Sequence, residues 1–371
     1  MNILKISAKM INRGILRLFF LHLLIFTSIG LFAQDSAVTF WDGFFMNSDY
    51  SKPFVSEIHS TQCKVELGYN KVESEFDLLE EKSRFQRPMV ELHLGFEAPL
   101  YATGFGIKGS EKSWGFGIRL PLSVHVLEDM WGPETAPVIN TDYRFGAPRF
   151  VAIRKISGNR FLKNISFSWI PMFHECTHLG DEITIYRMDE KFPITRINVS
   201  YEFTEFQVTL NDPGKSTDNC QSLKLGLMYR LSDRGQGWFS ARKNVEITQD
   251  INIPTSNYRA EYYADYLFQR SKGFLANKRC VNIFSLEVRN RLRYGYPLFR
   301  KVNGAWETKE IKETMEFCFN FYAGYKFLPK NNEGNHSVSL LFHAYNGLNP
   351  YGQLRNYSSY PFFGIALTYE P

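Results

Sequence analysis

The sequence predicts an all-β fold, namely an antiparallel transmembrane β-barrel of about twelve strands of the kind found in outer membranes. Apolar and polar residues alternate in runs of about ten from residue 87 to residue 369. Phe, Tyr and Trp make up 16% of the chain, more than a solvated surface accommodates. An export signal precedes both features. A bilayer offers no hydrogen-bond partners, so every backbone N–H and C=O must be paired within the protein. An extended chain therefore crosses a bilayer only as a closed barrel.

The segment 1–33 has the three regions of a cleaved secretory signal. Four basic residues and no acid come first, followed by the apolar run 18–26 and a small-residue cleavage site that ends at Ala33. Removing the four positive charges lowers the formal net charge from +5 to +1, so no nucleic-acid partner is expected. The predicted location is the outer membrane of a Gram-negative cell, and the expected partners are outer-membrane lipids and the barrel-assembly machinery.

The mature chain reads as one domain, with an N-terminal lead-in over 34–62 and the barrel over 63–371. It has no run of 18 or more apolar residues, so no transmembrane helix is expected. A secreted β-sandwich is the alternative, but sandwich strands are shorter and recur every ~8–12 residues. The candidate strands are 63–71, 88–99, 113–126, 140–155, 164–177, 194–209, 220–231, 237–248, 258–269, 282–296, 315–327, 336–347 and 360–369.

This list has one strand too many, because single-chain bacterial barrels use even numbers. The weakest candidates are 63–71, which could be a periplasmic lead-in, and 237–248, whose alternation is poor. If the surplus strand lies between the connections 178–193 and 348–358, both connections belong to the same side of the membrane, and we favour this arrangement. The C-terminal strand alternates and ends on Tyr369, close to the terminal aromatic residue that marks barrels for assembly.

Charged residues on the strand 282–296 set its register. An Arg on the lipid face at mid-depth costs ~2–4 kcal/mol, so the charged face must be the lumen. The predicted luminal residues are Glu287, Arg289, Arg291 and Arg293, and the predicted lipid-facing residues are Phe284, Leu286, Val288 and Leu292. The three arginines, which we call the arginine stripe, could favour the entry of anions into the lumen. Their neutralisation by the luminal acids Glu261, Asp265 and Glu287 is the simpler interpretation.

The densest chemistry lies in the segment 174–182. Continued alternation puts His174, Cys176, His178, Gly180 and Glu182 on the lumen face and Glu175, Thr177 and Asp181 on the other face. Neighbouring strands lie ~4.8 Å apart, so same-face residues at equal height can hydrogen-bond. We therefore expect one buried polar cluster built from His174, His178, Asp181 and Glu182 together with Asp142, Arg144 and Glu202.

Three functions fit this segment. A structural network that pins a long loop is the simplest, in a non-enzymatic protein that is structural or handles small solutes or lipids. The second is an acyl-ester hydrolase of membrane lipids with Cys176 as nucleophile, His174 or His178 as base, and Asp181 or Glu182 as orienter. The third is an H-E-x-x-H zinc hydrolase, but that motif needs a helix, and residues four apart on a strand lie ~13 Å apart. Neither a metal nor a cofactor is expected.

The run H-E-C-T-H-L-G-D-E over 174–182 resembles the H-x-S-S-H-L-G-D-E signature of a Gram-negative outer-membrane barrel family that is a domain of unknown function. Three further runs fit in order: N-T-D-Y-R-F-G over 140–146, S-Y-E over 200–202 and Y-N-G-L-N-P-Y-G-Q over 345–353. The resemblance implies an outer-membrane barrel and supplies no activity. The chain departs from the signature at Cys176 and Thr177, where the family has serines, which weakens an analogy with serine hydrolases.

Five cysteines, an odd number, are spread through the chain without a C-x-x-C pair. In an oxidising compartment one disulfide is possible, for instance between Cys220 and Cys280 at two strand beginnings, but the sequence does not fix it. Cys318 alternates onto the lumen face as a small filler.

Overall fold

The structure is a computed structural model of the 371-residue chain. It describes the residues 38–44, 52–76, 81–107, 113–130, 138–156, 161–179, 195–197, 200–213, 220–233, 238–240, 251–252, 258–271, 280–293, 296–302, 305–328, 337–352 and 360–370. The predicted signal 1–33 lies outside these residues.

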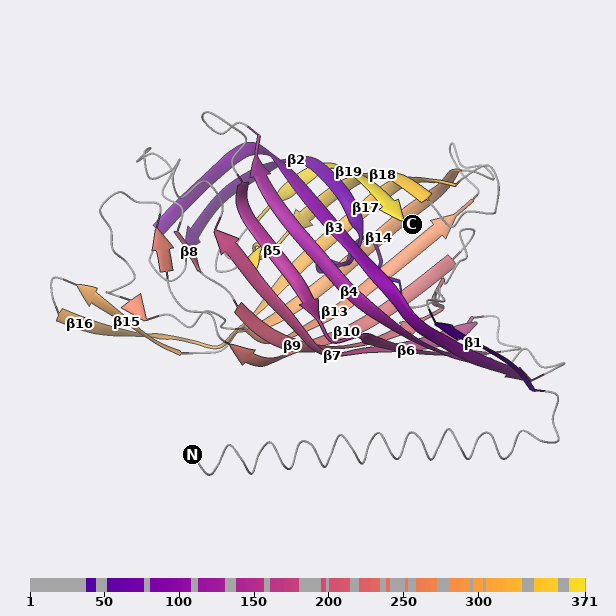
Figure 1. Ribbon diagram of the computed structural model, residues 1–371. Coiled ribbons are helices and arrows are strands. Elements are labelled where there is room, and N and C mark those ends of the chain that lie inside the picture. The colour runs from indigo at the N-terminus through magenta and orange to yellow at the C-terminus, as the bar shows by residue number, and fades with distance from the viewer. Residues whose placement is uncertain are drawn as a thin grey trace, which may run out of the picture.

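Twelve antiparallel strands, each paired with its neighbours along the chain, form a closed barrel (Figure 1). The predicted fold is confirmed. The strands of the wall are β2 (Cys63–Phe76), β3 (Glu81–Ile107), β4 (Ser113–Asp129), the interrupted strand β5 (Val138–Gly146) with β6 (Arg149–Lys155), β7 (Asn164–Leu179), β9 (Ser200–Leu210), β10 (Cys220–Asp233), β13 (Tyr258–Arg270), β14 (Cys280–Arg293), β17 (Thr314–Phe327), β18 (Ser337–Asn346) and β19 (Phe362–Glu370).

Strand β2 closes the ring. Lys64 lies opposite Thr368 of β19 on one edge and opposite His93 of β3 on the other. The weak candidate 63–71 is therefore a wall strand and not a lead-in. The surplus candidate is 237–248, in which the described strand β11 (Trp238–Ser240) pairs with β8 (Thr195–Ile197) in a separate sheet. This segment lies between the two long connections, as we favoured from the strand count.

Four further strands complete the described secondary structure. Strand β1 (Val38–Phe44) pairs with the end of β3 and continues the line of β2 along the same edge. Strands β12 (Ile251–Asn252), β15 (Tyr296–Val302) and β16 (Ala305–Ile311) form a small sheet of their own. Within the described residues, no helix has the length and apolarity needed to cross a membrane.

The two faces of the wall differ sharply in polarity. On β19 the outward side chains Phe363, Ile365, Leu367 and Tyr369 are exposed, whereas Ala366 and Thr368 between them are buried. Outward aromatic and aliphatic residues recur on the other strands, and most buried polar side chains point inward. Apolar side chains therefore cover the outside of the wall, while hydrogen bonds, ion pairs and two buried apolar clusters hold the interior together.

The strand ends define two rims. The connections 77–80, 130–137, 180–199, 234–257, 294–313 and 347–361 join strands at one end, which we call the loop rim. The connections 108–112, 156–163, 211–219, 271–279 and 328–336 join strands at the other end, the turn rim, near which the C-terminus lies. The connections at 178–193 and 348–358 therefore share a rim, as expected.

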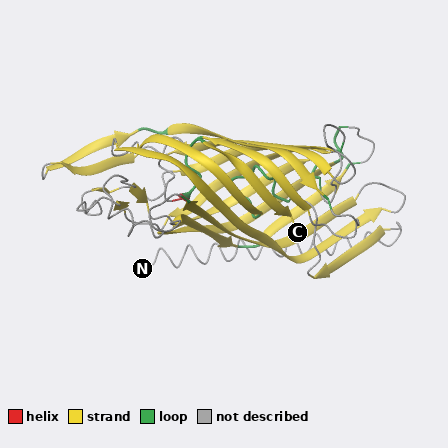
Figure 2. Ribbon diagram, turned by 90° about the horizontal axis from the view of Figure 1, so that it is seen from above, coloured by secondary structure: helices red, strands yellow, loops and turns green. Residues whose placement is uncertain are grey.

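The second described part of the lead-in enters the barrel. Residues 52–62, between β1 and β2, leave the wall and lie inside the lumen as an irregular segment, which we call the plug (Figure 2). On the edge of β3 that pairs with β2 and β1, the register leaves residues 94–100 unpaired, and the chain turns inward there.

All five cysteines are free thiols, so the disulfide considered for Cys220 and Cys280 does not form. Strand β13 lies between β10 and β14, and two strand spacings of ~4.8 Å exceed the ~7 Å over which a disulfide can bridge Cα atoms. Cys318 is fully buried in the lumen opposite Arg289.

Candidate functional site

A β-bulge in β7 decides which way the predicted site faces. Ile170 pairs with Glu205 and Phe173 with Phe203, so β7 has one residue more than β9 over this stretch. Below the bulge the even-numbered residues Ser166 and Ser168 point inward; above it the odd-numbered residues do. Because side chains alternate with a period of two, one extra residue exchanges the faces of everything beyond it.

The predicted orientation of segment 174–182 is consequently wrong above the bulge. Glu175 and Thr177, expected on the outside, are buried in the lumen, whereas His174 and Cys176 are half-exposed on the outer face. His178 ends the described part of the strand and its side chain lies outside the described residues, as do Gly180, Asp181 and Glu182.

The inner part of the predicted cluster centres on Arg144 of β5. Its guanidinium lies 2.7 Å from Glu175 Oε2, and both side chains are only 1% exposed. Asp142, one inward position along β5, accepts a hydrogen bond of 3.0 Å from the backbone N–H of Gly352. The connection between β18 and β19 thus reaches into the barrel and is held there by the wall.

The outer part of the predicted cluster is separate. His174 Nδ1 lies 3.3 Å from Glu202 Oε1, and its ring packs against Phe145 with centroids 5.1 Å apart. Cys176 lies on the same outer face between Tyr143 and Ser200 of the two neighbouring strands. The wall therefore divides the predicted single cluster, with Asp142 and Arg144 inside and His174 and Glu202 outside.

The H-E-x-x-H run does not form a zinc-protease motif. Residues 174–178 are extended within β7, and two histidines four positions apart on a strand are separated by ~13 Å. The helical turn that would bring both imidazoles to one ion is absent at these residues.

The arginine stripe of β14 lies where the alternation places it. Glu287, Arg289 and Arg291 are buried in the lumen, and the side chain of Arg293 lies outside the described residues. Arg289 makes ion pairs of 2.7 Å with Glu287 and 2.8 Å with Glu261. Arg291 Nε lies 3.1 Å from Glu261 as well. Neutralisation by luminal acids therefore accounts for the stripe.

Asp265, the third luminal acid, binds the plug. Its carboxylate accepts a hydrogen bond from Ser56, whose hydroxyl also contacts Ser285. The backbone N–H of Ile58 donates to Glu287 Oε2 at 3.1 Å. Two strands, β13 and β14, thus hold the middle of the plug.

Four more interactions attach the plug to other parts of the wall. Glu57 pairs with Lys224 of β10, and Thr61 donates to Glu97 of β3 at 3.1 Å. The Ser60 carbonyl lies 3.2 Å from His125 Nε2 of β4, and the Ser56 carbonyl accepts from Asn320 of β17 at 2.7 Å. Polar side chains of six wall strands therefore meet the backbone and side chains of one short segment.

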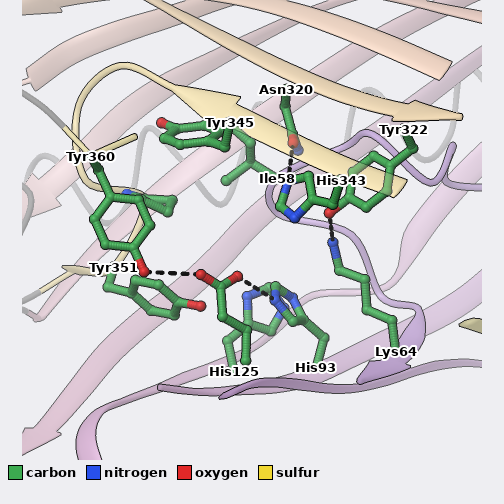
Figure 3. A pocket seen from close by; sticks show the side chains of 12 residues that line it. Ile58, Lys64, His93, His125, Asn320, Tyr322, His343, Tyr345, Tyr351 and Tyr360 are labelled. Atoms are coloured by element: carbon green, nitrogen blue, oxygen red, sulfur yellow. Dashed lines mark hydrogen bonds and ion pairs between the residues drawn. The ribbon is translucent and has the colours of Figure 1, made fainter. Parts of the chain in front are cut away.

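Beside the plug lies a small cavity lined by buried ionisable and aromatic residues (Figure 3). The cavity has a volume of about 20 Å³, counted as the space that the centre of a water molecule can occupy. This is room for about one water molecule or ion. The lining residues come from the plug, the wall and the inward connection: Ile58, Lys64, Glu91, His93, His125, Asn320, Tyr322, His343, Tyr345, Pro350, Tyr351 and Tyr360.

Hydrogen bonds fix most of the groups around the cavity. Tyr360 donates to Glu91 Oε1 at 2.9 Å, and Tyr322 donates to Glu66 Oε1 at 2.7 Å. Lys64 Nζ lies 2.9 Å from Glu66 Oε1. The ring of His343 stacks on Tyr322 with centroids 4.1 Å apart.

Sequence reasoning missed this cavity, although the signal was present. In β2 the inward positions hold Lys64 and Glu66, and in β3 they hold Glu91 and His93. Both strands alternate, so their charged faces could have been assigned to the lumen, as for β14. The plug was not foreseeable in this way, because residues 52–62 carry no periodic pattern.

No family model and no curated protein sequence matches the chain. Among solved structures, the barrel is similar to the translocator domain of the autotransporter NalP from Neisseria meningitidis, with a TM-score of 0.36 and 9% sequence identity. The match covers 85% of this chain and 90% of that chain. At this level of similarity it carries no functional argument.

The buried pair of Arg144 and Glu175 tests whether the wall divides the predicted cluster into an inner and an outer part. Replacing Glu175 with Ala leaves the Arg144 guanidinium buried without its partner, so we expect the free energy of unfolding to fall by ~3–5 kcal/mol. Glu202 is also buried, but its partner His174 is partly exposed and is charged only when protonated. We therefore expect Glu202→Ala to cost less than Glu175→Ala. Denaturant titration of the protein in lipid vesicles measures both. Equal losses would contradict the placement of these two carboxylates.

Proposed function

We propose that this protein is a non-enzymatic outer-membrane β-barrel whose lumen is closed by its own N-terminal segment. The apolar outer wall and the polar interior support a position in a bilayer. The basic n-region, apolar run and small-residue cleavage site of 1–33 support export to the outer membrane. The long connections of the loop rim then face the exterior, and the C-terminus faces the periplasm.

The attachment of the plug to six wall strands carries this proposal. A segment that contacts β3, β4, β10, β13, β14 and β17 crosses the lumen and cannot leave it without breaking many buried polar contacts. Each buried polar group left without its partner costs ~1–3 kcal/mol. The resting barrel is therefore not a diffusion pore.

The inward connection closes the lumen further at the loop rim. Gly347 adopts a φ of +145°, a conformation that favours glycine, and turns the chain inward after β18. Leu348 and Tyr351 are buried, and the Asn349 carbonyl accepts a hydrogen bond of 3.3 Å from Arg291. The cavity beside the plug has room for about one water molecule or ion. This cavity therefore has room for a small ion and not for a lipid.

Conductance in planar bilayers tests the closed lumen. A Cβ atom on Gly95 would lie 2.5 Å from the backbone of Thr61 in the plug, so Gly95→Val must displace the plug. We expect the wild-type protein to show no steady current and Gly95→Val to open ion-conducting channels. Leu94→Val, which changes the neighbouring outward side chain, is the control and should stay silent. A steadily conducting wild-type protein, or a silent folded Gly95→Val variant, would refute the closed lumen.

A second candidate, the hydrolysis of acyl esters in the outer leaflet, rests on one observation. The bulge turns Cys176 to the outer face of the barrel near the loop rim, beside a His174 that contacts Glu202 at 3.3 Å. A thiol, an imidazole and a carboxylate on one lipid-facing surface provide the residue types of a nucleophilic site. The two side chains lie on alternate residues of one strand, so their Cα atoms are ~6.6 Å apart.

Replacing Cys176 with Ala distinguishes the two candidates. The closed-barrel proposal predicts that the lipid composition of outer membranes stays the same as with the wild-type protein, because none of the described contacts that hold the plug involves the thiol. Comparative lipidomics of cells that carry either form is the measurement. Accumulation of an intact acyl lipid in the Cys176→Ala cells, with normal levels of folded barrel, would favour the hydrolase.

A further inference from the structure

Two carboxylates face each other directly across the inner wall. Glu66 of β2 and Glu91 of β3 are register partners, and His93 lies opposite Lys64 one inward position away. Glu66 is fully buried, and the ligand atoms of Glu66, Glu91 and His93 all lie within 4.8 Å of one another. Like charges directly opposite on two strands repel each other. Either a bound cation or a proton on one of the two carboxylates offsets this repulsion.

Besides His93, four side chains contact the two carboxylates. Lys64 lies 2.9 Å from Glu66 Oε1 and provides one positive charge for two carboxylates. His343 Nδ1 contacts the other oxygen of Glu66, and its Nε2 lies 2.7 Å from Asn320 Oδ1. The hydroxyls of Tyr322 and Tyr360 donate to the carboxylates without adding charge.

His93 provides an independent indication of a ligand. Its side chain is only 7% exposed, yet neither ring nitrogen has a hydrogen-bond partner. The distance from His93 Nε2 to Glu91 Oε2 is 3.6 Å, too long for a hydrogen bond. Two ligands of one tetrahedral ion with bonds of ~2.0 Å lie about 3.3 Å apart. The spacing is thus close to that of two ligands on a common ion.

The surrounding residues orient these ligands as the outer partners of a metal site do. Tyr360 holds Oε1 of Glu91, which leaves Oε2 of Glu91 near His93. Tyr322 holds Oε1 of Glu66, and His343 contacts its Oε2. Such partners fix the ligand geometry and tune affinity. The adjacent cavity has room for about one water molecule, which would complete a fourth position.

From these observations we propose that Glu66, Glu91 and His93 bind one divalent transition-metal ion in the lumen. Imidazole and carboxylate ligands together suit Zn²⁺ and its first-row neighbours, whereas Mg²⁺ is bound by oxygen ligands. The ion joins β2 to β3 next to the point where the plug re-enters the wall at residue 63. It thereby stabilises the seam at which the plug segment leaves and rejoins the barrel.

Calorimetric titration of the refolded full-length protein, stripped of metal with a chelator, tests this site. We expect one Zn²⁺ per chain, no comparable uptake of Mg²⁺, and a higher thermal unfolding midpoint with Zn²⁺. Replacing Glu91 with Gln keeps the shape of the side chain and removes one ligand charge. The Zn²⁺ affinity should fall by about 100-fold or more. Glu370→Gln, which alters a carboxylate paired with Lys326 at the turn rim, is the matched control and should bind as the wild-type protein does.

The Glu91→Gln variant also distinguishes metal binding from simple charge repulsion between Glu66 and Glu91. Without metal, Glu91→Gln relieves the repulsion with Glu66 and should unfold at a higher temperature than the metal-free wild-type protein. If Glu91→Gln does not fold, the visible spectrum of Co²⁺ bound to the wild-type protein decides, because a nitrogen and oxygen site of low coordination absorbs strongly. The absence of stoichiometric Zn²⁺ and of that Co²⁺ spectrum, or unchanged affinity in Glu91→Gln, would overturn the proposal.

Discussion

Closure of the hydrogen-bonded ring is the constraint on which the rest of the structure depends. A bilayer offers no partner for a free strand edge, so every wall strand must pair on both sides. Strand β2, the first strand of the wall, closes the ring because it pairs with the last strand, β19, on one edge and with β3 on the other. Lys64 lies opposite Thr368 on the first edge and opposite His93 on the second. The plug leaves the wall beside this seam. On the edge of β3 that pairs with β2 and β1, residues 94–100 have no strand partner, and the chain turns inward at this place.

The closed wall in turn creates the chemistry of the interior. The charges that are excluded from the outer face gather in the lumen, together with the plug and the connection between β18 and β19. Arg289, Arg144 and Lys224 each find an acidic partner, one of which belongs to the plug. Because a buried charge without a partner is costly, the plug contributes to the ion balance of the lumen as well as to its closure.

The alternation of the sequence was sufficient to predict the fold and most of the strands. It also placed Glu287, Arg289 and Arg291 in the lumen, since an arginine at mid-depth cannot face lipid. It failed at the bulge of β7, because one extra residue at Pro171 and Met172 reverses the faces while the pattern continues without a visible gap. Pro171 was the available signal, since proline within a sheet marks edges and bulges.

The interior site lay beyond what one sequence provides. Glu66, Glu91 and His93 come from two strands whose relative register is fixed only by pairing, and the cavity beside them exists only because residues 52–62 and the β18–β19 connection enter the lumen. Such irregular segments make contacts that no periodicity encodes. Their positions depend on the side chains of many strands, which meet only when the barrel has closed.

Hydrogen exchange of the plug tests the central claim most directly. The backbone N–H of Ile58 donates to Glu287, and those of Glu57 and Ser60 donate within the plug. If residues 52–62 lie inside the closed lumen, these amides should exchange as slowly as those of the wall strands when the folded protein in lipid is followed by mass spectrometry. Exchange of the plug at the rate of an unstructured peptide, beside a protected wall, would contradict the account.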